Sequence, residues 1–241
     1  PKSAARLLAI AHTNSQRLVR LINDILDIEK LESSRVVFNL SQVDLRSLVA
    51  HAIEENRGFA ESYGVRVRLD AASTDSEVNA DPDRLAQVVT NLLSNAIKFS
   101  PAGEEVLVAV ENNGNVVRVS VRDHGSGVPD DFKPHVFEKF SQADGTTSRQ
   151  KGGTGLGLSI VKQIVERLGG EVGFDDAPGG GTIFHVELPA WNENIAGEVD
   201  LDSDPGAVRI LLCEDDRDAA IVLRKALRRA GYAADFAYKM A

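Results

Sequence analysis

The sequence predicts an α+β fold, in which long helical segments and short strands both occur along the chain. Residues 3–32 contain no glycine or proline and are typical of one long helix. Valines alternate with other residues over 106–110 and again over 117–121, on either side of Asn112-Asn113-Gly114, which predicts a β-hairpin. The nearly continuous apolar run 208–213 is typical of a strand buried in a parallel sheet.

Composition and charge narrow the functional classes. The 241 residues are 43% hydrophobic and 26% charged, as in globular proteins, and no apolar run approaches the ~18 residues of a membrane span. A net charge of −9 argues against a broad nucleic-acid surface. The single cysteine, Cys213, excludes a disulfide within the chain and a cysteine zinc site. We therefore expect a cytoplasmic protein that does not bind nucleic acid.

The long helix over 3–32 carries apolar residues at alternating three- and four-residue spacing, which predicts a heptad seam with one polar position. So narrow a seam favours a partner helix or a second subunit over an ordinary core helix. His12 has no neighbouring carboxylate or base, and we interpret it as a surface or bundle histidine. The seam positions are Leu7, Ala11, Asn14, Leu18, Leu21, Ile25 and Ile28.

The following segment predicts a strand, a helix and a second strand. Residues 36–40 are expected to form a short strand. Asp44 is a predicted N-cap for a helix that runs to about Gly64, a natural C-terminal stop. Alternation over 65–69 predicts a half-buried strand.

Asp81-Pro82-Asp83 predicts the start of a further helix, which ends at Ser100-Pro101. Asn91 and Asn95 lie four residues apart on one of its faces, close to Lys98. Asparagine is a poor residue for the middle of a helix. The two asparagines are therefore either satisfied buried amides or ligands that face a cavity, and this helix alone does not decide between them.

The hairpin leads into Asp123-His124-Gly125-Ser126-Gly127. An aspartate at a strand end can accept a hydrogen bond from an exocyclic amine, while the glycines allow a flat ring to pack on the backbone. The alternative is a plain turn with a capping aspartate.

Residues 151–160 alternate glycine with other residues and then continue as an apolar helix. Exposed amides and the positive end of a helix dipole suit a phosphate, although most glycine-rich turns before helices bind nothing. The polar stretch 141–153 before them is a candidate mobile lid. Strands are expected over 171–174 and 182–188, around Gly179-Gly180-Gly181.

The last part of the chain predicts a linker and the start of another domain. Residues 191–206 lack periodicity. Glu214, Asp215 and Asp216 then follow the apolar strand, and acids at the carboxyl end of a parallel strand suit Mg²⁺. The remaining residues are too few to complete a doubly wound domain.

Together these motifs resemble the hybrid sensor histidine kinases of two-component signalling, in the order and spacing of that family. Residues 81–101 are similar to its N box, 123–127 to its G1 box with histidine where asparagine is usual, and 137–140 to its F box. Residues 153–158 are similar to its G2 box, and 179–182 to its last glycine element.

The resemblance implies a Bergerat-type ATP-binding α/β sandwich, preceded by a long dimerisation helix and followed by a truncated receiver-like fragment. The catalytic residues would be Asn95, which holds Mg²⁺, and Lys98 on the phosphates, while Asp123 would accept the adenine amine. Tentative receiver Mg²⁺ ligands are Glu214 and Asp215. The implied ATP-binding residues are Asn91, Asn95, Lys98, Asp123, Gly125, Gly127, Phe140, Gly153, Thr154, Gly155, Leu156, Gly157, Leu158 and Thr182.

The implied domains are a dimerisation helix (1–34), the ATP-binding domain (35–190), a linker (191–206) and a receiver start (207–241). The implied activity is transfer of the ATP γ-phosphate to a histidine absent from this sequence, for relay to a receiver aspartate beyond Ala241. The implied partners are a second copy of the chain, the phosphoacceptor helix and a response regulator or receiver. The parent protein would be anchored at the inner membrane through an upstream segment.

Two other functions compete with this one. Another ATPase of the same superfamily would lack the heptad helix upstream and the receiver downstream. A degenerate signalling scaffold would have lost site residues, whereas Asn95, Asp123 and the glycines are all present.

Overall fold

The computed structural model describes residues 2–32, 38–71, 76–142, 154–191, 209–213 and 233–237. The chain divides into two compact units between Trp191 and Asn192. Within the described ranges, no helix is both long and apolar enough to cross a membrane.

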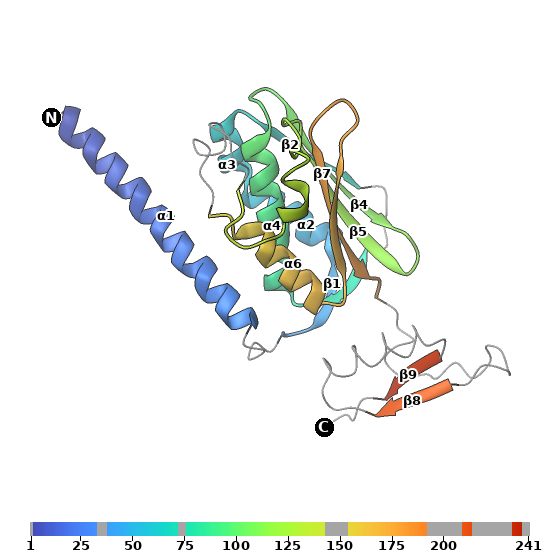
Figure 1. Cartoon of the computed structure of the whole chain (residues 1–241). Coiled ribbons are helices and arrows are strands. Elements are labelled where there is room, and N and C mark those ends of the chain that lie inside the picture. Colours follow the sequence, from blue (N-terminus) through green and yellow to red (C-terminus); the bar gives the residue numbers. More distant parts are fainter. Residues whose placement is uncertain are drawn as a thin grey trace. The chain divides into compact units, whose positions relative to one another are not determined.

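A five-stranded mixed sheet forms the centre of the first unit, with the strand order β2-β4-β5-β7-β6 (Figure 1). Strands β2 and β4 run parallel, and the other neighbours are antiparallel. Strands β1 and β3 form a small separate antiparallel sheet. The strands are β1 (Ser41–Asp44), β2 (Arg66–Ala71), β3 (Glu77–Ala80), β4 (Glu105–Asn112), β5 (Val116–Arg122), β6 (Glu171–Asp176) and β7 (Thr182–Pro189).

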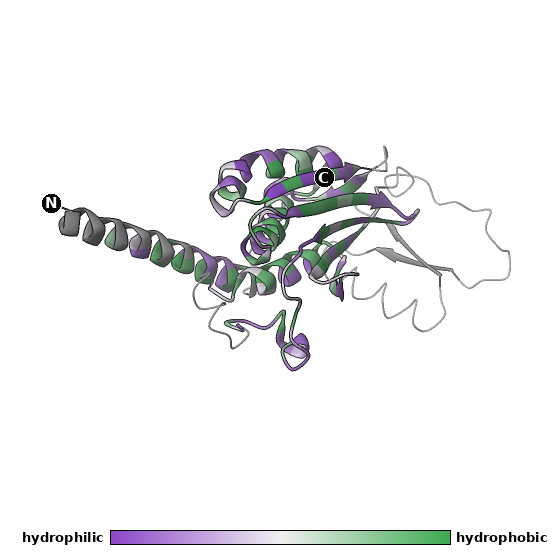
Figure 2. Ribbon diagram, turned by 90° about the horizontal axis from the view of Figure 1, so that it is seen from above, coloured by the Kyte–Doolittle hydropathy of each residue, from purple (hydrophilic) through white to green (hydrophobic). Residues whose placement is uncertain are grey.

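Alternating burial confirms the predicted hairpin. On β4 and β5, every second residue is a buried valine on the helix-covered face, while the residues between them are half-buried. Figure 2 shows hydrophobic residues along these strands. Because side chains alternate between the two faces of a strand, all of these valines lie on the face of the sheet that is packed in the core. The buried valines are Val106, Val108, Val110, Val117, Val119 and Val121.

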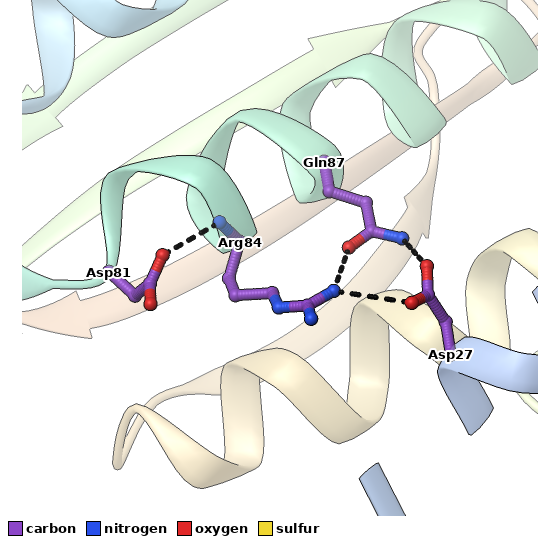
Figure 3. A network of polar contacts seen from close by, with 4 residues as sticks. All are labelled: Asp27, Asp81, Arg84 and Gln87. Atoms are coloured by element: carbon purple, nitrogen blue, oxygen red, sulfur yellow. Dashed lines mark hydrogen bonds and ion pairs between the residues drawn. The ribbon is translucent and has the colours of Figure 1, made fainter. Parts of the chain in front are cut away.

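Helices pack on one face of the sheet and make a two-layer sandwich (Figure 1). Asp81 caps α4 by accepting from the amides of Asp83 and Arg84, each at 3.1 Å, and it also accepts from the amide of Asn39 at 2.9 Å. Figure 3 shows the bond between Asp81 and the amide of Arg84. The elements are α2 (Leu45–Glu55), α3 (Arg57–Tyr63), α4 (Pro82–Phe99), the 3₁₀ turn η1 (Lys133–His135) and α6 (Gly157–Arg167).

The long N-terminal helix is confirmed as α1 (Lys2–Glu32), which packs against α6. Its predicted seam has mixed surroundings, because part of it packs within the chain and part of it is exposed to solvent. Ile28 and Leu31 are buried in the core and Leu21 packs on it, whereas other apolar residues point into solvent. We call the latter the exposed apolar stripe, and it consists of Leu18, Val19, Ile22, Ile25 and Leu26, which are 39–57% exposed.

The segment between α1 and α4 differs from expectation. A single helix was predicted from Asp44 to Gly64, and both predicted ends are confirmed: Asp44 accepts from the amide of Arg46, and Gly64 adopts φ 69°. However, the helix breaks at Asn56, whose side chain donates to the carbonyl of Ala52 at 2.8 Å and so competes with the regular backbone pattern.

The strand predicted over 36–40 is also misplaced. Residues 38–40 are not a strand, because the amide of Leu40 donates back to the carbonyl of Phe38 at 3.1 Å in a tight turn. The strand begins at Ser41 instead and pairs with β3, which the alternation did not reveal. Residues 36 and 37 lie outside the described residues.

In the second unit, β8 (Arg209–Cys213) and β9 (Ala233–Ala237) form a parallel pair. The strand predicted over 208–213 is confirmed as β8. Glu214, Asp215 and the linker residues 192–206 lie outside the described residues.

Candidate functional site

A buried carboxylate lies where β5 ends. Asp123 is only 4% exposed, and its Oδ1 accepts from the amides of Gly125 at 2.8 Å and Thr182 at 3.2 Å. Its own amide donates to the carbonyl of Thr182 at 2.9 Å. Burial raises the pKa of Asp123 above its ordinary 3.8, although the two amide hydrogen bonds oppose that rise. The side chain is thus held as a fixed acceptor.

The backbone around Asp123 has no room for side chains. A Cβ on Gly125 would lie 3.0 Å from both Asp123 Oδ1 and the Phe99 carbonyl oxygen. A Cβ on Gly181 would lie only 2.1 Å from the Asp123 carbonyl oxygen, and Gly181 also adopts φ +93°. These glycines therefore let three segments, the end of α4, residues 123–127 and residues 181–182, meet around one carboxylate.

The polar stripe of α4 faces the start of α6. Asn91 and Asn95 are half-buried while the apolar side of α4 is fully buried. Asn91 Oδ1 lies 3.5 Å from the position of a Cβ on Gly157, the first residue of α6. Lys98 is half-buried in the last turn of the same helix. The Asn91 amide and the N-terminus of α6 are therefore side by side, an arrangement that suits a bound anion.

The segment before α6 is held by three further contacts. Gly155 adopts φ +72°, and a Cβ there would lie 2.8 Å from the Phe140 carbonyl carbon. Thr154 Oγ1 accepts from the amide of Leu156 at 3.3 Å and donates to Asp24 Oδ2, on α1, at 2.9 Å. Leu156 is fully buried. The glycine-rich segment is thus fixed to its neighbours on both sides.

Phe140, which the resemblance implies as an ATP-binding residue, is exposed to solvent. Its side chain is 63% exposed, and it has the left-handed φ of 60° that side chains rarely adopt. Its backbone lies against Gly155.

The histidine in the G1-like segment turns away from Asp123. His124 Nδ1 lies 2.8 Å from the carbonyl oxygen of Glu105, at the start of β4, and its amide donates to Ser100 Oγ at 3.3 Å. The imidazole therefore fastens the segment to β4, whereas the bond to Ser100 comes from the backbone amide and does not depend on the side chain.

The structure brings several residues predicted for the site into two groups, one of Asn91 with Gly157 and one around Asp123. Asn91, Gly157, Asp123, Gly125 and Thr182 take part in the contacts above, while Gly127 lies next to Gly181, with φ +78°. Thr182 contributes its amide to Asp123. Leu158 is half-buried on α6. Gly153 and lid residues 143–153 lie outside the described residues.

The sequence reasoning missed Asp24, Asp27, Arg84 and Gln87, which join α1 to the α4–α6 side of the domain. The available signal was the pair of aspartates three residues apart on α1, which would lie on one face of a helix.

The comparisons with known proteins agree with this geometry. Residues 80–192 match the family described as histidine kinase-, DNA gyrase B-, and HSP90-like ATPases. These residues form a domain of that family. The match spans the whole of α4, the Asp123 segment, the start of α6 and the sheet from β4 to β7.

Named relatives place the chain near sensor histidine kinases. The circadian input-output histidine kinase CikA of Synechococcus elongatus is 34% identical over 225 residues, which cover 92% of this chain and 30% of CikA. Sensor protein GacS of Pseudomonas syringae is 35% identical over 86% of this chain and 23% of GacS. The chain thus spans less than a third of each of these relatives and resembles hybrid sensor histidine kinases in that part.

A solved structure extends the likeness. Full-length ShkA, crystallised in complex with AMPPNP, is 29% identical and superposes with a TM-score of 0.66 over 96% of this chain and 48% of ShkA. The domain is therefore homologous to the catalytic domains of sensor kinases.

The Gly181 contact yields a stability prediction. We expect Gly179→Ala to cost about 1 kcal/mol, because it imposes only a positive φ of +85° in open space. Gly181→Ala should cost a further ~1–3 kcal/mol, since the new methyl also collides with Asp123. Urea unfolding of both variants measures the difference. Equal losses would contradict close packing at Gly181.

The raised pKa of Asp123 yields a pH prediction. The folded protein binds this proton more tightly than the unfolded chain, so charging the buried carboxylate lowers stability as pH rises through the folded pKa. Asp123→Asn keeps an oxygen for the two amides and removes the charge. We expect it to be more stable than the parent at neutral pH, with the advantage lost below pH 3.8. Urea unfolding across pH tests this, and a variant less stable at neutral pH would refute it.

Proposed function

We propose that this chain is the ATP-binding catalytic core of a sensor histidine kinase, which transfers the γ-phosphate of Mg²⁺-bound ATP to a histidine outside this sequence. Two neighbourhoods bordered by α4 carry the proposal: Asn91 lies beside the start of α6, and the end of α4 meets two glycine segments around buried Asp123. The likeness to histidine kinases supports the same conclusion.

Adenine fits the Asp123 end of the site. Oδ1 already accepts two backbone amides, so Oδ2 is the oxygen we assign to the exocyclic amine of the base. The glycines at 125 and 181 let the surrounding backbone close on this carboxylate and fix its orientation. Burial strengthens a hydrogen bond to this carboxylate and favours a base that donates over one that only accepts.

The phosphates fit the other end. Asn95 would hold Mg²⁺, Lys98 would neutralise phosphate charge, Asn91 would lie nearby, and Gly153, Gly155 and Gly157 would offer their amides. In the described ranges there is no group of three or more histidine, cysteine, aspartate or glutamate side chains that could hold a metal. The proposed Mg²⁺ would therefore arrive with the nucleotide and take ligands from its phosphates, as this ion commonly does.

Such a site catalyses phosphoryl transfer by position and charge. Mg²⁺, when bound, neutralises negative charge on the transferred group. Lys98 and the amides before α6 would hold the phosphates in one orientation, which lowers the entropic part of the barrier. The second substrate would be a histidine side chain, and the phosphate would pass on to the aspartate of a receiver. The parallel pair β8–β9 and the acids Glu214 and Asp215 support a receiver start in this chain.

Nucleotide binding tests the proposal. We expect the parent to bind Mg²⁺ and a non-hydrolysable ATP analogue with micromolar affinity in a calorimetric titration. Asn95→Ala should weaken binding at least about tenfold, since a hydrogen bond to a charged group is worth about 1.5–3 kcal/mol. Asp123→Asn should do the same, because its amide would face the adenine amine, donor against donor.

Asn113→Ala, in the exposed hairpin turn, is the matched control and should bind like the parent. Absence of binding by the folded parent would refute the proposed function and favour a scaffold. If binding is found, adding a histidine-bearing helix in trans tests phosphotransfer.

We further propose that the chain forms a homodimer through the exposed apolar stripe of α1. Its residues recur at i, i+1, i+4, i+7 and i+8, the spacing of a helix face that packs on another helix. The opposite residues Ile28 and Leu31 already pack within the chain.

Sedimentation tests this interface. Ile22→Lys places a charge in the middle of the stripe and should shift the chain from dimer to monomer at concentrations where the parent self-associates. Asn23→Lys adds the same charge at the next position, which is exposed but not apolar, and should leave the dimer intact. A parent that stays monomeric over a wide concentration range would overturn the proposed dimer.

A further inference from the structure

Two aspartates of α1 contact the elements that border the proposed phosphate end: Asp27 contacts α4, and Asp24 contacts Thr154 in the segment before α6. Asp27 accepts from Gln87 at 2.8 Å and pairs with Arg84 at 3.5 Å, and Arg84 also donates to Gln87 at 3.0 Å (Figure 3). The carboxylate of Asp27 and the guanidinium of Arg84 are only 25% and 23% exposed. This network fastens α1 to the first turns of α4.

The second aspartate reaches the glycine-rich segment. Asp24 accepts the hydroxyl proton of Thr154 at 2.9 Å, and the same hydroxyl oxygen accepts from the amide of Leu156 at 3.3 Å, next to the first residue of α6. While this contact exists, the hydroxyl proton points to Asp24 and cannot be donated to another acceptor. The position of α1 is thus connected to the local structure at the start of α6.

The charge of Asp24 conflicts with the ligand proposed for this segment. A polyphosphate held by the amides before α6 would bring several negative charges close to a half-buried carboxylate. Like charges in a partly buried setting repel strongly, because water and salt screen them less than at an open surface. A docked α1 and a bound triphosphate therefore oppose each other.

We propose that Asp24 and Asp27 form an aspartate latch whose engagement with Thr154, Arg84 and Gln87 is antagonistic to binding of nucleotide phosphates. This inference rests on the proposed function. Because coupling between two equilibria is reciprocal, an engaged latch weakens triphosphate binding, and the triphosphate releases the latch. Ile28 and Leu31 remain buried in the core, so the end of α1 stays attached when the latch opens. The latch thereby links nucleotide occupancy to the freedom of the exposed apolar stripe.

Charge and contact can be separated by conservative variants. Asp24→Asn keeps an oxygen for the Thr154 hydroxyl but removes the charge, and Asp27→Asn loses the ion pair with Arg84 at the other anchor. Glu29→Gln removes the same charge from an exposed position of the same helix and is the matched control. The full chain of each variant is titrated with adenosine, with Mg-ADP and with the Mg²⁺ complex of a non-hydrolysable ATP analogue.

The expected signature is a dependence on phosphate number. Asp24→Asn should bind the triphosphate about fivefold more tightly than the parent, ADP with a smaller gain, and adenosine unchanged. High salt should reduce the gain. Asp27→Asn should also tighten triphosphate binding, since it weakens docking, and Glu29→Gln should match the parent. An equal gain in affinity for all three ligands would indicate a loosened structure and would overturn the latch. The latch would also be overturned if Asp24→Asn bound the triphosphate no more tightly than Glu29→Gln.

Hydrogen exchange over residues 14–27 supplies a second readout. In the parent, exchange should rise when the triphosphate is added. In nucleotide-free Asp27→Asn, which loses the ion pair with Arg84, exchange should already be raised, and in Asp24→Asn, which keeps an acceptor for Thr154, it should be raised less. If the parent binds none of the three ligands, both the proposed function and the proposed antagonism are refuted. Hydrogen exchange in the nucleotide-free variants would still show whether the two aspartates hold α1 against the domain.

Discussion

A carboxylate removed from water needs fixed donors, and the donors of Asp123 are backbone amides from two separate segments, at Gly125 and Thr182. Both amides can reach Oδ1 only because residues 123–127 and 181–182 touch, which Gly181 permits. The β5–β7 pairing places Arg122 opposite Ile183, so both segments lie at the same end of these two strands. The site is therefore a consequence of sheet register as much as of the motif residues.

Helix α4 also helps to position the site. The buried face of α4 packs in the core while Asn91 lies beside the first residue of α6, and the end of α4 reaches Gly125 through the Phe99 carbonyl. One helix thus borders both the base end and the phosphate end of the proposed site. A shift of α4 along the sheet would alter both ends together, so its N-cap at Asp81 matters to function as well as to stability.

Local signals explain what the sequence could predict. The cap at Asp81, the alternating valines of the hairpin and the glycine segments each depend on a few neighbouring residues, and all of them predicted the observed elements. The helix break at Asn56 depends on a side chain that could equally have faced solvent. The surroundings of the α1 seam were only partly predicted, because helical spacing does not show whether an apolar residue packs on the same chain or on a second chain. The contact between Asp24 and Thr154 joins residues 130 positions apart and exists only once α1 has docked.

Strand β3 connects the end of the domain to the start of α4. The amide of Trp191 donates to the carbonyl of Glu77 at 2.6 Å, and Ala190 bridges to Val78, so the chain leaves the domain clamped to β3. Strand β3 runs directly into Asp81, the cap of α4. The strand that holds residues 190 and 191 therefore leads into the first two turns of α4, where Arg84 and Gln87 also contact α1. The two segments that flank the domain in sequence are thus both connected to the same end of one helix.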